Sequence, residues 1–234
     1  MGHGTTNSNT TIGITDLMTS LAMIFILLFA ALITQTTSEA QSELQENKEN
    51  VGIALRDHLE RLGLSLEADP RDPLTLMIVV PENLLTFEFG ESTLTPDADR
   101  FLEEAIPYYA AAVCGTLRDK IDSLAIQGHT DDRGDDVYNL QLSQERSLAV
   151  MVKGLEVIQR QEPSAYQCFQ EMTIAAGRGR QDLIYDRQNR VNSQKSRRVV
   201  FKIRLRSTEQ RHPTEQISKQ RHPTEQIFKT FSAL

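Results

Sequence analysis

The hydrophobic pattern changes character along the chain, and its first part is almost wholly apolar. From Ile12 to Ile33 the segment holds one ionisable side chain, Asp16. An α-helix of roughly 20 apolar residues crosses a hydrocarbon core of ~30 Å. We therefore expect a transmembrane helix over residues 12–35, preceded by a short cytoplasmic tail over residues 1–11.

Two other interpretations of the apolar run are weaker. A cleaved signal peptide carries a basic segment ahead of its apolar core, but residues 1–15 contain no Lys or Arg. A buried helix of a soluble protein is rarely apolar on every side over such a length. A retained single-pass anchor is the better interpretation, and the acids Glu39, Glu43 and Glu46 that follow it favour a cytoplasmic N-terminus.

A polar, acidic stretch follows the span and is typical of an exposed helix that continues it. In its second half, apolar residues recur at three- and four-residue spacing: Val51, Leu55, Leu59, Leu62 and Leu66. This spacing predicts a narrow apolar stripe, suited to a helix pair or to docking on a domain. The sequence ADPRDP ends the pattern, so we expect a helical connector over residues 36–73.

Strand and helix patterns then alternate, which predicts one α/β unit over residues 74–206. Strands are expected at the segments LTLMIVV, LLTFEFG, SLAIQGHTD, MTIAAG and RVVFKIRLR. Thr95 and Pro96 have the residue types of a helix cap and first turn. We expect this helix to reach about Arg118, with a kink or an early end at Pro107.

A second, longer helix is expected from Val137 to about Gln161. In the last strand, apolar positions alternate with polar ones, which predicts a sheet with one buried and one solvent-facing side. The final segment, residues 207–234, contains the sequence QRHPTEQI twice. Its polar composition and its prolines predict a disordered tail, with a partner-binding role as the alternative.

Charge and motif content exclude several classes of protein. The net charge of -7 argues against nucleic acid as a partner, because phosphate binding needs a dominant basic face. We find no nucleophile paired with a base and no phosphate-binding loop, so neither an enzyme nor a cofactor is expected. His129 has no further ligand at metal-binding spacing, which favours a structural role over a metal site.

Asp16 lies near the start of the apolar run, so it either reaches the membrane interface or faces other helices. Thr19 and Ser20 follow three and four residues later and therefore share its helical face. Acids inside spans usually face a helix bundle or a water-filled path. The two hydroxyls favour an ion-binding group made of Asp16, Thr19 and Ser20.

The segment TDLMTSL, which contains Asp16, resembles the membrane segment of MotB-type stator proteins. In that family the aspartate is the ion-binding site of a motor in the inner membrane. The resemblance implies that Asp16 carries the transported H+ or Na+, between which the sequence does not choose. It also implies a homodimer whose paired spans lie inside a ring of MotA-like subunits.

The segment IQGHTDDRGDDVYNLQLSQERSLAV resembles the peptidoglycan-binding motif of OmpA-like domains. The matching positions are Gly128, His129, Thr130, Asp131, Gly134, Asn139, Leu142, Ser143 and Arg146. The segments FEFGESTLTPDADRFLEE and RRVVFKI also fit, so the resemblance covers roughly residues 74–206. Together with the span predicted from the apolar run, it implies a single N-terminal transmembrane helix followed by a periplasmic OmpA-like α/β domain of the βαβαβ type.

The resemblance also implies residue roles. Peptidoglycan stem peptides carry diaminopimelate, and an arginine fork such as Arg146 binds its carboxylate while Asp131 accepts from its amine. Thr130, Asn139 and Leu142 would line the site, and the spacing along the helix puts the last two on one face with Arg146. An internal ion pair between Asp131 and Arg146, which would merely hold the loop, is the alternative.

A wall-binding domain lies outside the cytoplasmic membrane, where disulfides persist, so Cys114 and Cys168 are candidates for a bond. The short uncharged tail and the connector resemble ZorB, the MotB-like subunit of Zorya anti-phage systems, which works with a ZorA ring, more than flagellar MotB. A flagellar stator subunit and a passive tether between membrane and cell wall remain alternatives.

Overall fold

The computed structural model describes residues 8–88 and 90–207, with side chains from Leu17 onward. The repeated tail therefore lies outside the described residues except for its first position. The chain divides into two compact units, Met1–Gln45 and Glu46–Leu234.

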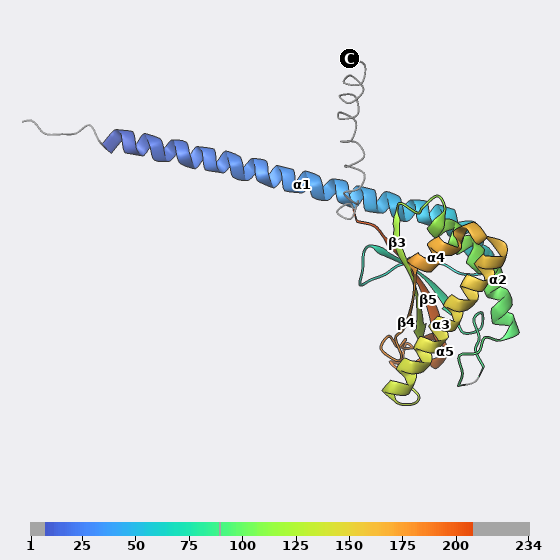
Figure 1. The fold of residues 1–234 in the computed structure, drawn as a ribbon. Coiled ribbons are helices and arrows are strands. Elements are labelled where there is room, and N and C mark those ends of the chain that lie inside the picture. The colour runs from blue at the N-terminus through green and yellow to red at the C-terminus, as the bar shows by residue number, and fades with distance from the viewer. Residues whose placement is uncertain (1–7, 89, 208–234) are drawn as a thin grey trace, which may run out of the picture. The chain divides into compact units, whose positions relative to one another are not determined.

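Helix α1 spans Ser8–Arg61 and forms all of the described part of the first unit (Figure 1). In this unit its large apolar side chains are exposed, with Leu17 71% and Phe29 67% accessible. Among the described residues, α1 alone is long and apolar enough to cross a membrane, with a mean hydropathy of 2.5 in its apolar part. This agrees with the predicted span.

The last turns of α1 belong to the second unit. Val51, Leu55 and Leu59 are buried there, as the predicted apolar stripe requires. The His58 ring stacks on Tyr108, with 3.7 Å between the ring centroids. Burial lowers the pKa of His58, and the neighbouring Arg61 acts in the same direction.

The connector differs from its prediction beyond Arg61. The helix ends there, and Gly63 adopts a positive φ of 67°, which suits a glycine after a helix C-terminus. Leu66 does not extend the helical stripe but begins strand β1, Leu66–Ala68. The spacing of Leu62 and Leu66 therefore gave a wrong prediction, because the chain turns at the glycine between them.

Five strands form one sheet in the order β1-β2-β5-β3-β4. The other strands are β2 (Thr75–Pro81), β3 (Ile121–His129), β4 (Thr173–Gly177) and β5 (Arg198–Leu205). Strands β3 and β4 are parallel, and the remaining neighbours are antiparallel. Strand β5 therefore lies between β2 and β3, a placement that brings distant parts of the sequence together.

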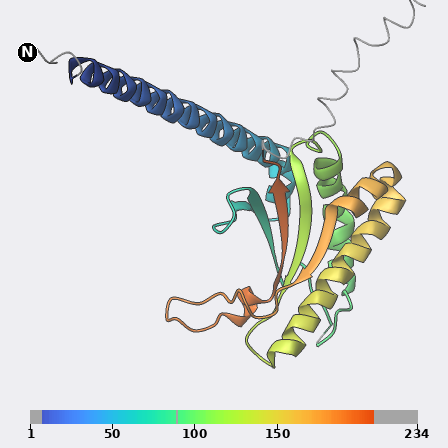
Figure 2. The same ribbon diagram turned by 60° about the vertical axis from the view of Figure 1, so that its left-hand side comes forward.

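Helices α2 (Pro96–Cys114), α3 (Asp136–Gln161) and α4 (Tyr166–Met172) cover one face of the sheet (Figure 2). Phe201 of β5 and Tyr109 of α2 meet in the core between these layers, with ring centroids 5.1 Å apart. Helix α2 begins as predicted, because the Thr95 side chain accepts from the Ala98 N–H. It continues through Pro107 and ends at Cys114, before the predicted Arg118.

The polar residues of β5 lie on the other face of the sheet. Lys202 Nζ lies 2.6 Å from Asp69 Oδ2, and Arg204 Nη1 lies 2.6 Å from Asp72 Oδ2. These partners come from the ADPRDP segment, which therefore does more than end a helix. The alternation predicted for the last strand is confirmed for Val199, Phe201, Ile203 and Leu205, which are buried, but Val200 on the other face is buried as well.

The segment LLTFEFG was expected to be a strand, and this prediction is wrong. It contains one isolated β-bridge, between Phe87 and Leu94. The segment turns back on itself at Gly90, which has a φ of 72°, and Glu88 N–H donates to Thr93 O at 2.9 Å. Because its backbone bonds are used locally, the segment does not join the sheet.

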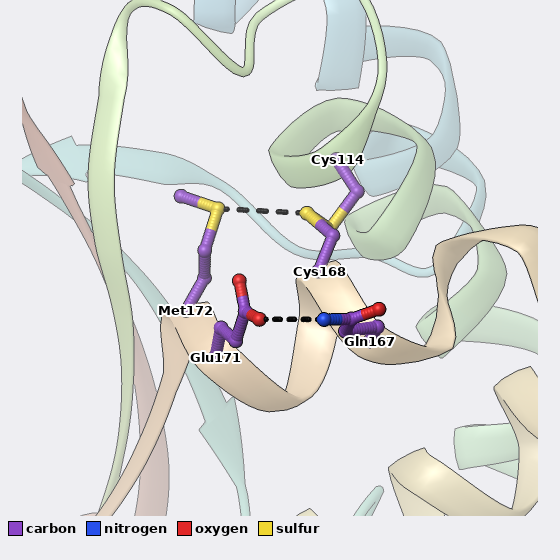
Figure 3. Close-up of a disulfide and its surroundings, with 5 residues drawn as sticks. All are labelled: Cys114, Gln167, Cys168, Glu171 and Met172. Atoms are coloured by element: carbon purple, nitrogen blue, oxygen red, sulfur yellow. Dashed lines mark hydrogen bonds between the residues drawn. A yellow bond between two sulfur atoms is a disulfide. The ribbon is translucent and has the colours of Figure 1, made fainter.

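Cys114 and Cys168 form a disulfide that joins α2 to α4 (Figure 3). Their Cα atoms are 5.9 Å apart, a distance within the usual range for such bonds. Met172 Sδ lies 3.7 Å from Cys168 Sγ on the same helix. The predicted pairing of the two cysteines is confirmed.

Candidate stem-peptide site

The candidate site begins in the loop between β3 and α3. Asp131 follows the end of β3 closely, and Gly134 allows the sharp turn because its φ is 88°. Asp135 caps α3 by accepting from the Tyr138 N–H at 2.9 Å. Asn139 Nδ2 donates to Arg133 O at 2.8 Å and so ties the loop to the first turns of the helix.

Two glycines bring α3 close to the sheet. Gly128 and Gly177 are register partners on β3 and β4, and both face Ser143. A Cβ atom at Gly128 would lie 2.2 Å from Ser143 O, and one at Gly177 would lie 2.7 Å from Ser143 Oγ. Because neither strand carries a side chain here, α3 can pack directly on the backbone. This contact fixes the position of Arg146, which lies one turn further along the helix.

Two contacts hold the Arg146 side chain, and they leave the two terminal nitrogens of its guanidinium without a hydrogen bond within the described part of the chain. Its Nε donates to Glu91 O at 2.9 Å, and its guanidinium carbon lies 4.9 Å from the centre of the Phe87 ring. Within the described part of the chain, Arg146 makes no other side-chain hydrogen bond. Burial lowers the pKa of Arg146 from its ordinary value, but arginine remains charged at neutral pH. Its terminal amino groups can therefore bind an anion.

Asp131 is nearly enclosed, with 7% of its side chain exposed. Its Oδ2 accepts from Arg133 Nε at 2.9 Å, Arg133 Nη2 at 2.7 Å and Arg197 Nη1 at 2.7 Å. Its Oδ1 accepts from the Arg133 backbone N–H at 3.1 Å. Burial opposes ionisation, but these hydrogen bonds outweigh it and hold the pKa of Asp131 below its ordinary value.

Arg197 is a site residue that the sequence did not single out. Its Nε lies 2.7 Å from both carboxylate oxygens of Glu82, and its Nη1 reaches Asp131. The Glu82 carboxylate is the main cause that raises the pKa of Arg197, although burial acts in the opposite direction. Arg197 thus bridges the two acids and stays charged.

Arg146 and Arg197 border one small cleft at the end of the sheet, and Asp131 adjoins it through its bond to Arg197. The lining of the cleft includes Glu82, Leu85, Phe87, Arg146 and Arg197. An apolar wall, a cation with unused donors and an adjoining carboxylate together suit a ligand that carries both a carboxylate and an amine.

The other residues predicted to line the site contribute to the structure of the loop and of the helix. Thr130 is buried, and its N–H donates to Gly179 O at 3.0 Å. Asn139 uses its amide to hold the loop, and Leu142 is buried on the same helix. The alternative of a direct Asp131–Arg146 ion pair is wrong, because Asp131 pairs with Arg133 and Arg197 instead.

His129 is buried beside this site and stays neutral. Burial, together with the positive charge of Arg198, lowers the pKa of His129 to about 3. Its Nδ1 lies 3.9 Å from Asp182 Oδ2. Among the described residues, no group of three His, Cys, Asp or Glu side chains is placed to hold a metal ion.

The proposed ion-binding group in α1 is described only in part. The backbone of Asp16 lies in the helix, but its side chain is outside the described set. Thr19 and Ser20 are exposed residues of the same helix. The assignment of these three residues to ion binding stays a prediction.

The second unit is similar to known proteins. The model of the OmpA family matches residues 86–197. A putative MotB like protein from Desulfovibrio vulgaris is 24% identical with a TM-score of 0.51, over 74% of this chain and 99% of that one. The periplasmic domain of Helicobacter pylori MotB is 17% identical with a TM-score of 0.45, over 67% of this chain and 88% of that one.

One curated protein also matches a part of the chain. The photosystem I chlorophyll a apoprotein A2 of Gloeobacter violaceus is 35% identical over 91 residues, or 36% of this chain. The chain spans 9% of the length of that protein, so this likeness says nothing about function. The family match and the fold define the molecule as an N-terminal apolar helix followed by an OmpA-like α/β domain.

Proposed function

We propose that the OmpA-like domain binds the stem peptide of peptidoglycan. Arg146 takes a carboxylate of diaminopimelate through its terminal amino groups, and Asp131 accepts from the amine. The observation that carries this proposal is the Arg146 fork, which is fixed at Nε by Glu91 O and borders a cleft next to an enclosed carboxylate. Such preorganisation reduces the entropy that a bound ligand loses.

Sedimentation with purified cell-wall sacculi tests this function. The full chain in detergent should sediment with sacculi, and Arg146→Ala should remain in the supernatant. Arg160→Ala is a matched control, because Arg160 lies on the same helix and pairs with Glu103 away from the site. If Arg146→Ala sediments as well as the control, Arg146 does not hold the wall.

We further propose that α1 anchors the chain in the bacterial inner membrane, with the domain on the periplasmic side. The exposed apolar surface of α1 supports this placement, and so does the disulfide of the domain, because disulfides persist outside the cytoplasm. A chain held by the membrane at one end and by the wall at the other would be fixed at two points, as a stator subunit must be.

Ion-driven work is the finer part of this proposal. Asp16, with Thr19 and Ser20 on its helical face, would carry H+ or Na+ within a ring of MotA-like subunits around a homodimer. Asp16→Asn separates the motor from a passive tether. A motor loses ion flux in the reconstituted complex while wall binding persists, whereas a tether is unaffected in every respect.

Among stators, we place this chain with the ZorB subunits of Zorya anti-phage systems, in line with its connector. The neighbouring genes test this choice. A gene for a MotA-like subunit beside a helicase or nuclease gene supports a defence role. A location among flagellar genes overturns it in favour of a flagellar stator.

A further inference from the structure

The Arg133 side chain already bonds to Asp131, the acid that is proposed to accept the amine of the ligand. Its Nε and Nη2 both bond to Asp131 Oδ2, at 2.9 and 2.7 Å. Arg197 donates to the same oxygen, and the Arg133 backbone N–H donates to the other oxygen, Oδ1. A carboxylate offers about four acceptor positions, so Asp131 has little capacity left for a ligand.

The two arginines on Asp131 differ in how firmly they are held. Arg197 is 24% exposed and is also bonded to both oxygens of Glu82. The Arg133 side chain is 70% exposed, and within the described part of the chain its guanidinium bonds to Asp131 alone. Arg133 is therefore the partner of Asp131 that can be displaced without breaking a second ion pair, whereas Arg197 is also tied to Glu82.

A displaceable partner stabilises the charge of Asp131 in the ligand-free protein. Asp131 is 7% exposed, and an enclosed carboxylate without enough partners is costly. Arg133 supplies hydrogen bonds while no ligand is present, and it can return to water as a solvated side chain. The ligand amine then replaces the guanidinium without leaving the acid unpaired.

We propose that Arg133 is a built-in competitor for the ammonium group of the ligand. The proposal rests on the proposed stem-peptide function. The apparent affinity of a site falls by the fraction of molecules that are open to the ligand. Arg133 therefore weakens binding of ligands that use Asp131, and it leaves binding of ligands that use Arg146 alone unaffected.

Calorimetry on the full chain in detergent tests this competition with two soluble probes. The first is the tripeptide L-Ala-γ-D-Glu-meso-diaminopimelate. The second is the same peptide without the distal amine, so it keeps its carboxylates but needs nothing from Asp131. Arg133→Ala is compared with Arg180→Ala, which removes an equal charge from an exposed pair with Asp136 that does not touch Asp131.

Because the Arg133 side chain is 70% exposed, its pair with Asp131 contributes up to ~1 kcal/mol, so removing the competitor should tighten tripeptide binding about two- to fivefold. The amine-free peptide should bind Arg133→Ala no more tightly than the wild type. Arg180→Ala should show no gain with either probe. A gain confined to the amine-bearing peptide is the result that a general change in charge or in loop structure does not produce.

Failure of this inference is distinct from failure of the proposed function. If the wild type binds the tripeptide, Arg146→Ala does not, and Arg133→Ala binds it no more tightly than Arg180→Ala, the competitor idea is overturned and the stem-peptide site stands. If neither the wild type nor Arg133→Ala binds the tripeptide, both ideas are wrong. Binding by Arg133→Ala alone would be the strongest form of the competition.

Discussion

Arg197 Nη1 lies 2.7 Å from Asp131 Oδ2 and links the acid of the peptidoglycan motif to the start of the last strand. The two residues are far apart in the sequence. They meet because β5 lies between β2 and β3, with Arg198 opposite both Pro81 and His129 in register. The site is thus assembled at one end of the central three strands.

Loss of Arg197 should destabilise the domain and impair binding. Arg197→Ala leaves two acids, Glu82 and Asp131, without their shared partner, and breaking a partly buried pair of this kind costs about 2–4 kcal/mol. Arg190→Ala is the control, since its pair with Asp186 leaves the Arg190 side chain 74% exposed, and such pairs contribute ~0–1 kcal/mol. Thermal unfolding of both variants in detergent measures the difference, and equal melting temperatures would contradict the bridging role.

Gly128 should not tolerate a methyl group. Gly128→Ala places a Cβ atom 2.2 Å from Ser143 O, so α3 must move away from the sheet, at a cost of about 1–3 kcal/mol for overpacking. Because Arg146 lies on α3, sacculus binding should weaken as well. Gly52→Ala is the control, since its Cβ meets nothing within 4 Å and alanine favours the helix by up to ~1 kcal/mol. A Gly128→Ala variant as stable as wild type would refute this close contact.

Reduction of the disulfide should lower thermal stability. The bond closes a loop with a sequence separation of 54, and the chain-entropy model assigns such a loop about 4 kcal/mol. For a domain of this size that corresponds to a fall of about 10 °C in Tm. The measurement is a thermal melt with and without a reducing agent, and Cys114→Ala with Cys168→Ala should reproduce the reduced value. An unchanged Tm would mean that the bond contributes nothing to the fold.

The stability of the domain should decline as the pH falls below about 6.5. The folded pKa of His129 is about 3, so between these values the unfolded chain binds a proton that the folded chain does not. His58, whose pKa burial also lowers, acts in the same direction. Asp131 has a lowered pKa, so its contribution is present above the unfolded value of about 3.9 and is lost as the pH falls towards the folded one.

Ligand binding should respond to pH differently from stability. Asp131 is ionised and His129 is neutral in the folded chain from about pH 5 to 8. Tripeptide affinity measured by calorimetry should therefore be constant across this range, although unfolding experiments on the same samples show declining stability. A binding transition centred near pH 6.5 would assign the site to a titrating histidine instead of Asp131.

Local patterns predicted most of the elements. The cap and proline at Thr95 and Pro96 marked the start of α2, and the alternation in RVVFKIRLR marked the buried face of β5. The wrong predictions came where a turn interrupted a hydrophobic pattern that would otherwise indicate a helix or a strand. Glycine at position 63 ended α1 within an apparent helical stripe, and glycine at position 90 folded back an apparent strand.

The candidate site was predictable only in its contiguous part. Asp131 and Arg146 stand in one motif, so their shared location follows from a strand, a loop and a helix in sequence order. Glu82, Phe87 and Arg197 come from other segments and join the site through the strand order, which the spacing of residues does not reveal. The available signal for Arg197 was its place in the loop directly before β5, because binding residues are often found on loops.

A crystal structure of the full chain with the tripeptide L-Ala-γ-D-Glu-meso-diaminopimelate tests the central claim most directly. We predict a carboxylate of the peptide on the terminal amino groups of Arg146 and the distal amine on Asp131, with the Arg133 side chain turned into solvent. A peptide bound elsewhere, with Arg133 still on Asp131 and the Arg146 fork unoccupied, would contradict this account.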